Sequence, residues 1–286
     1  MSTNTYIGYE FAVAVVDQAV AHTTYDRSEL LRAVSALVLW SNANSVAIEL
    51  EKVFARDNIV AHIEGGLTGF GQGTRTNRRS QLLRVAEALL EPSLAPRALP
   101  ALAASDPTMP YTEEEQAALL EWARKEKRAR RGDDAMVLLA LGFGAGLSAQ
   151  EVMNVRAGDV EVTDGAVMVY VREGRVRVVP VLRRWETALG RRAAALKAEE
   201  YLFKPGRDGA GKNLISNFVA KARVDGVHAQ TQRMRSTWLV QQMAACTPLP
   251  ELIDAAGVDS LEALTRYLGF VERKATLDVV AKLRAA

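Results

Sequence analysis

Arginines are the residues whose number and spacing suggest chemistry in this chain. The whole sequence of 286 residues has a formal net charge of only +2, yet residues 171–235 contain 15 lysines and arginines against 6 acidic residues. Positive charge concentrated in this way is typical of a surface that binds phosphate groups. Arg172, Arg175 and Arg177 are predicted to alternate along one strand and to form a row of like charge. Such a row opposes folding unless an anion covers it, and we expect DNA phosphate to be that anion.

Four short motifs follow one another in the second half of the chain. They read Gly146-Leu147-Ser148-Ala149-Gln150-Glu151, a predicted hairpin over 171–180 that ends in Val179-Pro180, Gln232-Arg233-Met234-Arg235-Ser236-Thr237, and Leu268-Gly269-Phe270. Their order and spacing resemble the motifs of the catalytic domain of the tyrosine recombinase (phage integrase) family. The resemblance implies a mainly α fold with a small antiparallel β-sheet, a helical core-binding-like domain ahead of it, and double-stranded DNA as the partner.

The resemblance also implies where the catalytic groups of the family should lie, and most of those positions carry other residues. Only Arg235 matches, at the second catalytic arginine. The degenerate positions are Ser148 at the first arginine, Arg172 at the lysine, Gln232 and Phe270 at histidines, and Val279 at the nucleophilic tyrosine. The hairpin leaves Arg175 as an alternative to Arg172 at the lysine position.

These substitutions bear on whether the protein can cut DNA. Strand cleavage needs an attacking oxygen, donors that stabilise the charge on the phosphate, and an acid for the leaving hydroxyl. Val279 has no nucleophilic atom, and Ser148 is too short and neutral to clamp two phosphate oxygens. Arg172 stays protonated and is a poor proton donor, although it and Arg235 can still bind phosphate. We therefore expect no catalytic residues and no recombinase activity, with DNA binding retained.

Tyr267 is the nearest alternative nucleophile, three residues before Phe270. Its place in an apolar helical pattern predicts a packed aromatic ring with one polar tip. If it attacked DNA instead, the protein would be an active site-specific recombinase with a displaced nucleophile.

The first part of the chain is predicted to form a separate helical domain. Apolar residues recur at helical spacing in four stretches, over 8–21, 28–40, 45–61 and 77–90. Five prolines between residues 92 and 110 then indicate a stiffened linker. The predicted boundaries are 1–95 for the core-binding-like domain, 96–110 for the linker and 111–286 for the tyrosine-recombinase-like domain.

Arg75, Arg78 and Arg79 lie at the predicted start of the helix over 77–90. Helix N-terminal amides and arginines suit phosphate, so we expect this segment to contact DNA. Arg78 is open to two interpretations, as a phosphate contact or as a reader of base edges. The full set of predicted DNA-binding residues is Arg75, Arg78, Arg79, Arg172, Arg175, Arg177, Lys212, Arg233 and Arg235.

The elements that should position the second-domain motifs are also visible in the sequence. Thr112, followed by three glutamates, predicts a capped helix start. Strands are predicted over 160–162, 166–171 and 176–180, with Asp164-Gly165 as a hairpin turn.

Several other kinds of site find no support in the sequence. The three histidines and the single cysteine lack metal-ligand spacing, so we expect no metal and no cofactor. The glycine-rich run Gly142-Phe143-Gly144-Ala145-Gly146 lacks the lysine that would follow in a phosphate-binding loop. No stretch is long and apolar enough for a membrane span. One cysteine fits a reducing compartment, and we expect a cytoplasmic, nucleoid-associated protein.

These observations predict a sequence-specific DNA-binding protein on an inactive recombinase fold. A transcriptional regulator, such as a repressor of a phage or mobile element, is the role that the resemblance implies. Two alternatives stay open: the active recombinase, and a protein-interaction module that forms homo-oligomers through its C-terminal helix without DNA.

Overall fold

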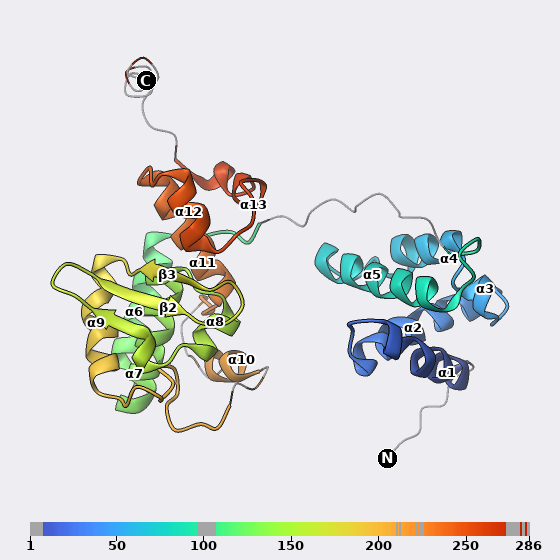
Figure 1. The fold of residues 1–286 in the computed structure, drawn as a ribbon, viewed down its shortest axis with the longest axis horizontal. Coiled ribbons are helices and arrows are strands. Elements are labelled where there is room, and N and C mark those ends of the chain that lie inside the picture. Colours follow the sequence, from blue (N-terminus) through green and yellow to red (C-terminus); the bar gives the residue numbers. More distant parts are fainter. Residues whose placement is uncertain are drawn as a thin grey trace. The chain divides into compact units, whose positions relative to one another are not determined.

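The structure is a computed structural model that describes residues 8–95, 107–209, 211, 213–220, 222, 226–272, 281 and 284. The chain divides into two compact units, residues 1–105 and 106–286, each with its own hydrophobic core (Figure 1). The division lies inside the predicted linker, most of which is outside the described residues.

The first unit is entirely helical in its described part. Its elements are α1 (Tyr9–Ala19), the turn η1 (Val20–His22), α2 (Arg27–Ala43), α3 (Leu50–Val53), α4 (Arg56–Ala61), the π-helical turn η2 (His62–Gly66) and α5 (Gln72–Leu89). The three long helices α1, α2 and α5 pack on one another. Leu30, Val34, Leu37 and Val38 repeat at helical spacing along α2 and are fully buried, which explains why this segment is a helix on the core.

The start of α5 differs from the prediction. The helix begins at Gln72, five residues earlier than the predicted Asn77, with extended Gly71 ahead of its first turn. The glycines and polar residues over 71–76 favour a loop by composition, but the first turn of a helix tolerates them because it makes few intrahelical bonds of its own. Arg75, Arg78 and Arg79 consequently lie inside the helix rather than at its N-terminus.

The second unit is mainly α with one small sheet, as the sequence predicts (Figure 1). Its helices are α6 (Glu113–Lys125), α7 (Ala129–Leu139), α8 (Ala149–Asn154), α9 (Arg183–Ala194), α10 (Leu214–Val219), α11 (Thr231–Ala244), α12 (Leu249–Ala256) and α13 (Glu262–Thr265). Shorter turns are η3 (Ala140–Gly144), which continues α7, η4 (Ala157–Asp159) and η5 (Leu268–Phe270). The capped start at Thr112 is confirmed: its hydroxyl accepts from the amide of Glu115, whose carboxylate accepts from the amide of Thr112.

The three strands of the sheet are antiparallel in the order β1 (Val160–Val162), β2 (Val167–Val171), β3 (Arg177–Pro180). Val169 of β2 lies opposite Val160 on one side and Val179 on the other. Val167, Val169 and Val171 are buried while the residues between them are partly exposed, so one face of the sheet packs on the core. The strands agree with the predicted ranges to within one residue.

The predicted row of arginines along a strand is wrong. β2 ends at Val171 and β3 begins at Arg177, so residues 172–176 form the turn of the hairpin. Gly174 closes this turn with a φ of 73°, a conformation that glycine adopts without strain. Arg172 and Arg175 therefore lie in the turn, where their side chains need not point to the same side.

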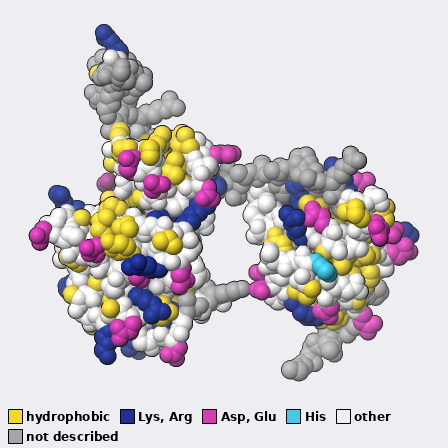
Figure 2. Space-filling view, viewed as in Figure 1, with side chains coloured by type: hydrophobic (Ala, Val, Ile, Leu, Met, Phe, Trp, Pro, Cys, Tyr) yellow, Lys and Arg dark blue, Asp and Glu magenta, His cyan; other side chains and the backbone are white. Residues whose placement is uncertain are grey.

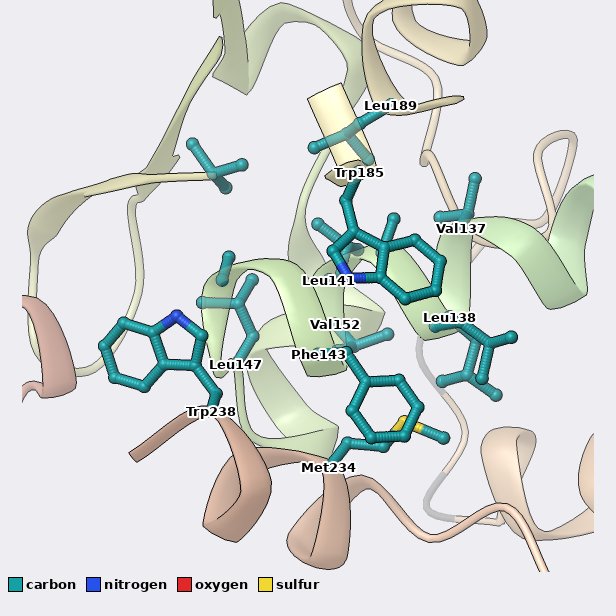
Figure 3. Close-up of a cluster of buried hydrophobic side chains, with 14 of the residues drawn as sticks. Val137, Leu138, Leu141, Phe143, Leu147, Val152, Trp185, Leu189, Met234 and Trp238 are labelled. Atoms are coloured by element: carbon teal, nitrogen blue, oxygen red, sulfur yellow. The ribbon is translucent and has the colours of Figure 1, made fainter. Parts of the chain in front are cut away.

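The core of the second unit is built around the glycine-rich end of α7 (Figure 3). Phe143 stacks on Trp185 with ring centroids 6.0 Å apart. Gly146 has a φ of 60°, and a side chain there would begin 2.4 Å from the ring of Trp238. The glycines of this run therefore let α9 and α11 approach the backbone of residues 142–146 closely.

None of the helices in the described part of the chain is both long and apolar enough to cross a membrane.

Candidate nucleic-acid interface

Arg235 lies at the centre of the second unit's polar site. From α11 it donates one hydrogen bond of 2.6 Å to the carbonyl of Gly146 and another to the carbonyl of Ala256, the last residue of α12. Burial is the main cause that lowers the pKa of Arg235, and the nearby Glu151 and Tyr267 oppose that shift. Arg235 thus connects the motif that begins at Gly146 to the end of α12.

Two arginines of the hairpin converge on the same place. Arg177 donates from Nε to the carbonyl of Ala255 at 2.8 Å, and Arg175 donates to the carbonyl of Gly257 and to the carboxylate of Asp259. We call Arg175, Arg177 and Arg235 the arginine cluster, and residues 255–259 the α12 end. Gly257 ends α12 in the left-handed conformation, which turns the chain there.

The arginine cluster is tied to the Ser148 motif through Glu151. Arg177, only 7% exposed, donates to the Glu151 carboxylate at 2.6 Å. Ser148 caps α8, because its hydroxyl accepts from the amide of Glu151 and its own amide donates to that carboxylate. Burial alone would raise the pKa of Glu151, but the hydrogen bonds from Arg177 and Ser148 hold it below its usual value. Ser148 therefore has a local structural role at the position expected for a catalytic arginine.

Arg172 is placed differently from the cluster. Its Nε lies 3.1 Å from the carboxylate of Asp159, its guanidinium sits over the ring of Tyr170, and its side chain stays 62% exposed. An exposed arginine held by a single surface ion pair is accessible to a phosphate, because such a pair contributes little free energy.

The fourth sequence motif does not contact the cluster in the way that the sequence suggests. Leu268–Phe270 forms the turn η5, whose Leu268 is 58% exposed, and the segment that meets Arg235 is the α12 end. The place of Phe270 at a histidine position of the family therefore stays a prediction. Val279 and Lys212 lie outside the described residues.

Tyr267 packs against the core of the second unit and is half-buried, as its apolar ring predicts. Tyr267 is also one of the groups that raise the pKa of Arg235, against the lowering effect of burial. In the family that the motifs resemble, the nucleophilic tyrosine follows the histidine of the fourth motif by nine residues, and Tyr267 follows Val258 of the α12 end by the same number.

Arg233 is bonded within the second unit, and its contact with DNA stays a prediction. It donates to the carbonyls of Met109 and Pro110, each at 3.1 Å, and to the carboxylate of Glu115 at 2.6 Å. Its guanidinium also lies 3.8 Å from the ring centre of Tyr111. Gln232, one residue earlier on α11, is exposed.

The predicted contacts of the first unit are only partly accessible. Arg79 is buried, and its contact with DNA stays a prediction. Arg75 donates to the carbonyl of Ile63 at 3.1 Å and Arg78 to the carbonyl of Arg32 at 3.0 Å. Both are half-buried, because they hold α5 against the neighbouring elements.

Arg78 lines an open groove of about 860 Å³ on the first unit. Trp40, Phe70 and His62 contribute aromatic rings to it. His62 is 2% exposed, and burial is the main cause that lowers its pKa to about 4.

The excess of positive charge over 171–235 is balanced by acids from other parts of the sequence. Ion pairs join Arg172, Arg175, Arg177, Arg192 and Arg233 to Asp159, Asp259, Glu151, Asp134 and Glu115 respectively. On the face of the second unit seen in Figure 2, basic and acidic side chains accordingly lie side by side. The charge count overstated the basic surface because it left out these long-range partners. Among the described residues, no group of three or more metal-ligating side chains is found.

The comparisons with known proteins rest on structure alone. No family model matches the sequence, and no curated protein matches it. The structure of the XerH site-specific recombinase bound to a palindromic difH substrate is similar, with a TM-score of 0.62 and 14% identity over 90% of this chain and 78% of that chain. The Tn1549 transposon integrase in complex with circular intermediate DNA gives 0.60 and 14% over 95% and 98%. A lambda integrase dimer bound to a COC′ core site gives 0.60 and 14% over 94% and 99%.

The chain therefore has the fold of the tyrosine recombinases, which confirms the resemblance and the fold class drawn from its motifs. At 14% identity the similarity establishes the fold and leaves the activity to the residues of the site.

Proposed function

We propose that this protein binds double-stranded DNA without cutting it, as a sequence-specific regulator such as a repressor of a phage or mobile element. The observation that carries the proposal is the arginine cluster, in which three guanidinium groups from two distant segments converge on one set of anionic or partly anionic oxygens. Guanidinium groups held in this way bind phosphate oxygens well. The similar structures are described as complexes with DNA, which supports duplex DNA as the ligand.

The absence of cleavage is supported by the residues around Arg235. Ser148 uses its hydroxyl to cap α8 and carries no charge for a phosphate. Of the chain's three histidines, His22 and His62 belong to the first unit, and His228 is exposed ahead of α11. Without a second arginine of the expected kind and an imidazole, transition-state stabilisation and proton donation both lose their usual groups.

Tyr267 gives a second candidate function, because it lies near Arg235 and has a nucleophilic oxygen. An active recombinase would form a covalent tyrosine–phosphate bond as the phosphodiester breaks and its 5′-hydroxyl leaves. The test is incubation with nicked duplexes that contain the protein's bound site, followed by denaturing electrophoresis. We expect no adduct; an adduct that forms with the natural protein and disappears in Tyr267→Phe would establish the second candidate.

DNA binding itself is tested by the salt dependence of duplex affinity. With roughly five phosphate contacts, the logarithm of affinity should fall against the logarithm of salt with a slope of about −4 or steeper. Selection of bound fragments from a random pool would then give the preferred site. Failure to bind any duplex at low salt would refute the proposal and favour the interaction module. Homo-oligomers through the C-terminal helix are part of that alternative, and most of residues 273–286 lie outside the described residues.

A further inference from the structure

The end of α12 occupies the donors of the arginine cluster. Arg235 and Arg177 donate to the carbonyls of Ala256 and Ala255, and Arg175 donates to Gly257 and Asp259. These donors of the cluster are therefore taken by oxygens of the same chain, whereas Nη2 of Arg177 has no hydrogen-bond partner among the described residues.

The groups that fill the cluster resemble a phosphate in charge. Carbonyl oxygens at a helix C-terminus carry the negative end of the helix dipole, and the carboxylate of Asp259 adds a full negative charge. Gly257 fits tightly, since an added Cβ would lie 2.9 Å from Cζ of Arg177. A phosphate oxygen and the α12 end cannot accept the same hydrogen bonds at once, because each donor hydrogen points to a single place.

We infer that the α12 end is an internal competitor of DNA, because a phosphate can take these donor hydrogens of Arg175, Arg177 and Arg235 only when the α12 end gives them up. This inference rests on the proposed DNA binding and concerns the regulation of that same site. According to this inference, the affinity for DNA depends on how firmly the α12 end is bonded to the arginine cluster.

The structure shows which part of the α12 end is held weakly. Leu252 and Ala256 are buried on the core, so the body of α12 is firmly packed. Asp259 is 83% exposed, and its ion pair with Arg175 is of the kind that contributes little free energy. Two backbone positions with positive φ, Cys246 and Gly257, border the helix and allow the chain to turn there. Release begins most easily at Asp259 and extends back to Gly257.

The experiment compares two substitutions that change the charge equally. Asp259→Asn weakens the hold on Arg175, whereas Asp254→Asn removes an exposed carboxylate from the same helix without touching that ion pair. Both variants are substituted at exposed positions, and thermal melting of the full chain confirms that they fold. Affinity for duplex DNA is measured against salt for both variants and for the natural chain.

We expect Asp259→Asn to bind about fivefold more tightly, the upper size of an exposed ion pair, with a salt slope steeper by about one unit. Asp254→Asn should change affinity by less than about twofold, since its exposed carboxylate makes none of the ion pairs that hold the arginine cluster. In the natural chain, amide hydrogen exchange over residues 254–260 should quicken when duplex DNA is added, because the hydrogen bonds that hold this turn are lost on release.

The outcomes separate the two proposals. Equal effects of Asp259→Asn and Asp254→Asn, or slower exchange over 254–260 with DNA, would overturn the competitor inference and leave DNA binding standing. No binding of duplex by any of the three proteins at low salt would overturn both. Binding by Asp259→Asn alone would support the inference most directly.

Discussion

Acidification should destabilise the first unit through His62. The imidazole is buried beside Trp40, with ring centroids 5.9 Å apart, and its pKa falls from 6.5 to about 4 chiefly because of burial, with Arg78 adding to the shift. The unfolded chain therefore takes up a proton at this residue between pH 6.5 and about 4, while the folded chain does not. Stability rises with pH wherever the unfolded state binds more protons, so it must fall as the pH drops through this window.

The magnitude follows from the two pKa values. Between about pH 7 and pH 5 the linkage removes about 2 kcal/mol from the free energy of unfolding of the first unit, and about 3 kcal/mol once the pH falls below 4. The second unit behaves differently over this range. Its Glu151 has a lowered pKa, so its contribution is present above 4.5 and is lost only as the pH falls below that value.

The assay is urea unfolding at several pH values, followed by hydrogen exchange of peptides from α2 and η2 and from α9 and α11. Peptides of the first unit should open at lower urea at pH 5 than at pH 7, while those of the second unit should shift little. His62→Leu should flatten the pH dependence of the first unit, whatever its own stability. His22→Gln, a change at an exposed histidine of the same unit, is the matched control and should leave the dependence intact.

Two results would refute this reasoning. One is a pH dependence of the first unit that is equally steep in His62→Leu. The other is a second unit that loses stability in parallel between pH 7 and 5, because that would place the responsible group elsewhere.

Three further predictions concern the second unit. Glu151→Ala should lower its free energy of unfolding by about 3–5 kcal/mol in urea titrations, since Arg177 would stay buried without its partner; a loss under about 1 kcal/mol would contradict this. Gly146→Ala should cost about 1–3 kcal/mol or more, measured in the same way, because the new Cβ meets Trp238 and φ is positive. Arg172→Ala should keep the melting temperature but reduce the affinity for duplex DNA, with a salt slope smaller by about one unit. Arg235→Ala should reduce this affinity too, and it should also lower the melting temperature because the carbonyls of Gly146 and Ala256 lose their donor. Equal melting temperatures for the two arginine variants would show that the carbonyls find other partners.

Local features of the fold could be predicted because their causes lie within a few residues. Thr112 and Glu115 cap α6 reciprocally, and a capping residue followed three places later by glutamate is visible in any sequence. The strands follow from alternating valines such as Val167, Val169 and Val171. The predicted start of α5 was five residues late because the residues after Gly71 favour a loop by composition, whereas the first turn of a helix tolerates them.

The candidate site was harder to predict because its contacts join distant residues. Arg175 and Asp259 are 84 positions apart, and no local pattern indicates that they pair. The same holds for Arg233, whose carbonyl partners precede it by more than 120 residues. Arginines counted along the chain therefore look available for DNA when several are already bonded within the fold.

The bonds of Arg233 also show where the second unit begins. They indicate which residues carry a force applied to the chain that enters this unit. Met109 and Pro110 are bonded to Arg233, and the amide of Tyr111 donates to the hydroxyl of Thr237 at 2.8 Å. The prolines suggest a boundary at residue 111, but a fragment that began there would lack two of the acceptors of Arg233. A fragment meant to keep this fold must therefore start before Met109. Tension along the preceding segment is delivered to α11 at Arg233 and Thr237, the two positions that flank Arg235. The helix that carries the central arginine is thus also the mechanical anchor of the chain that enters the unit.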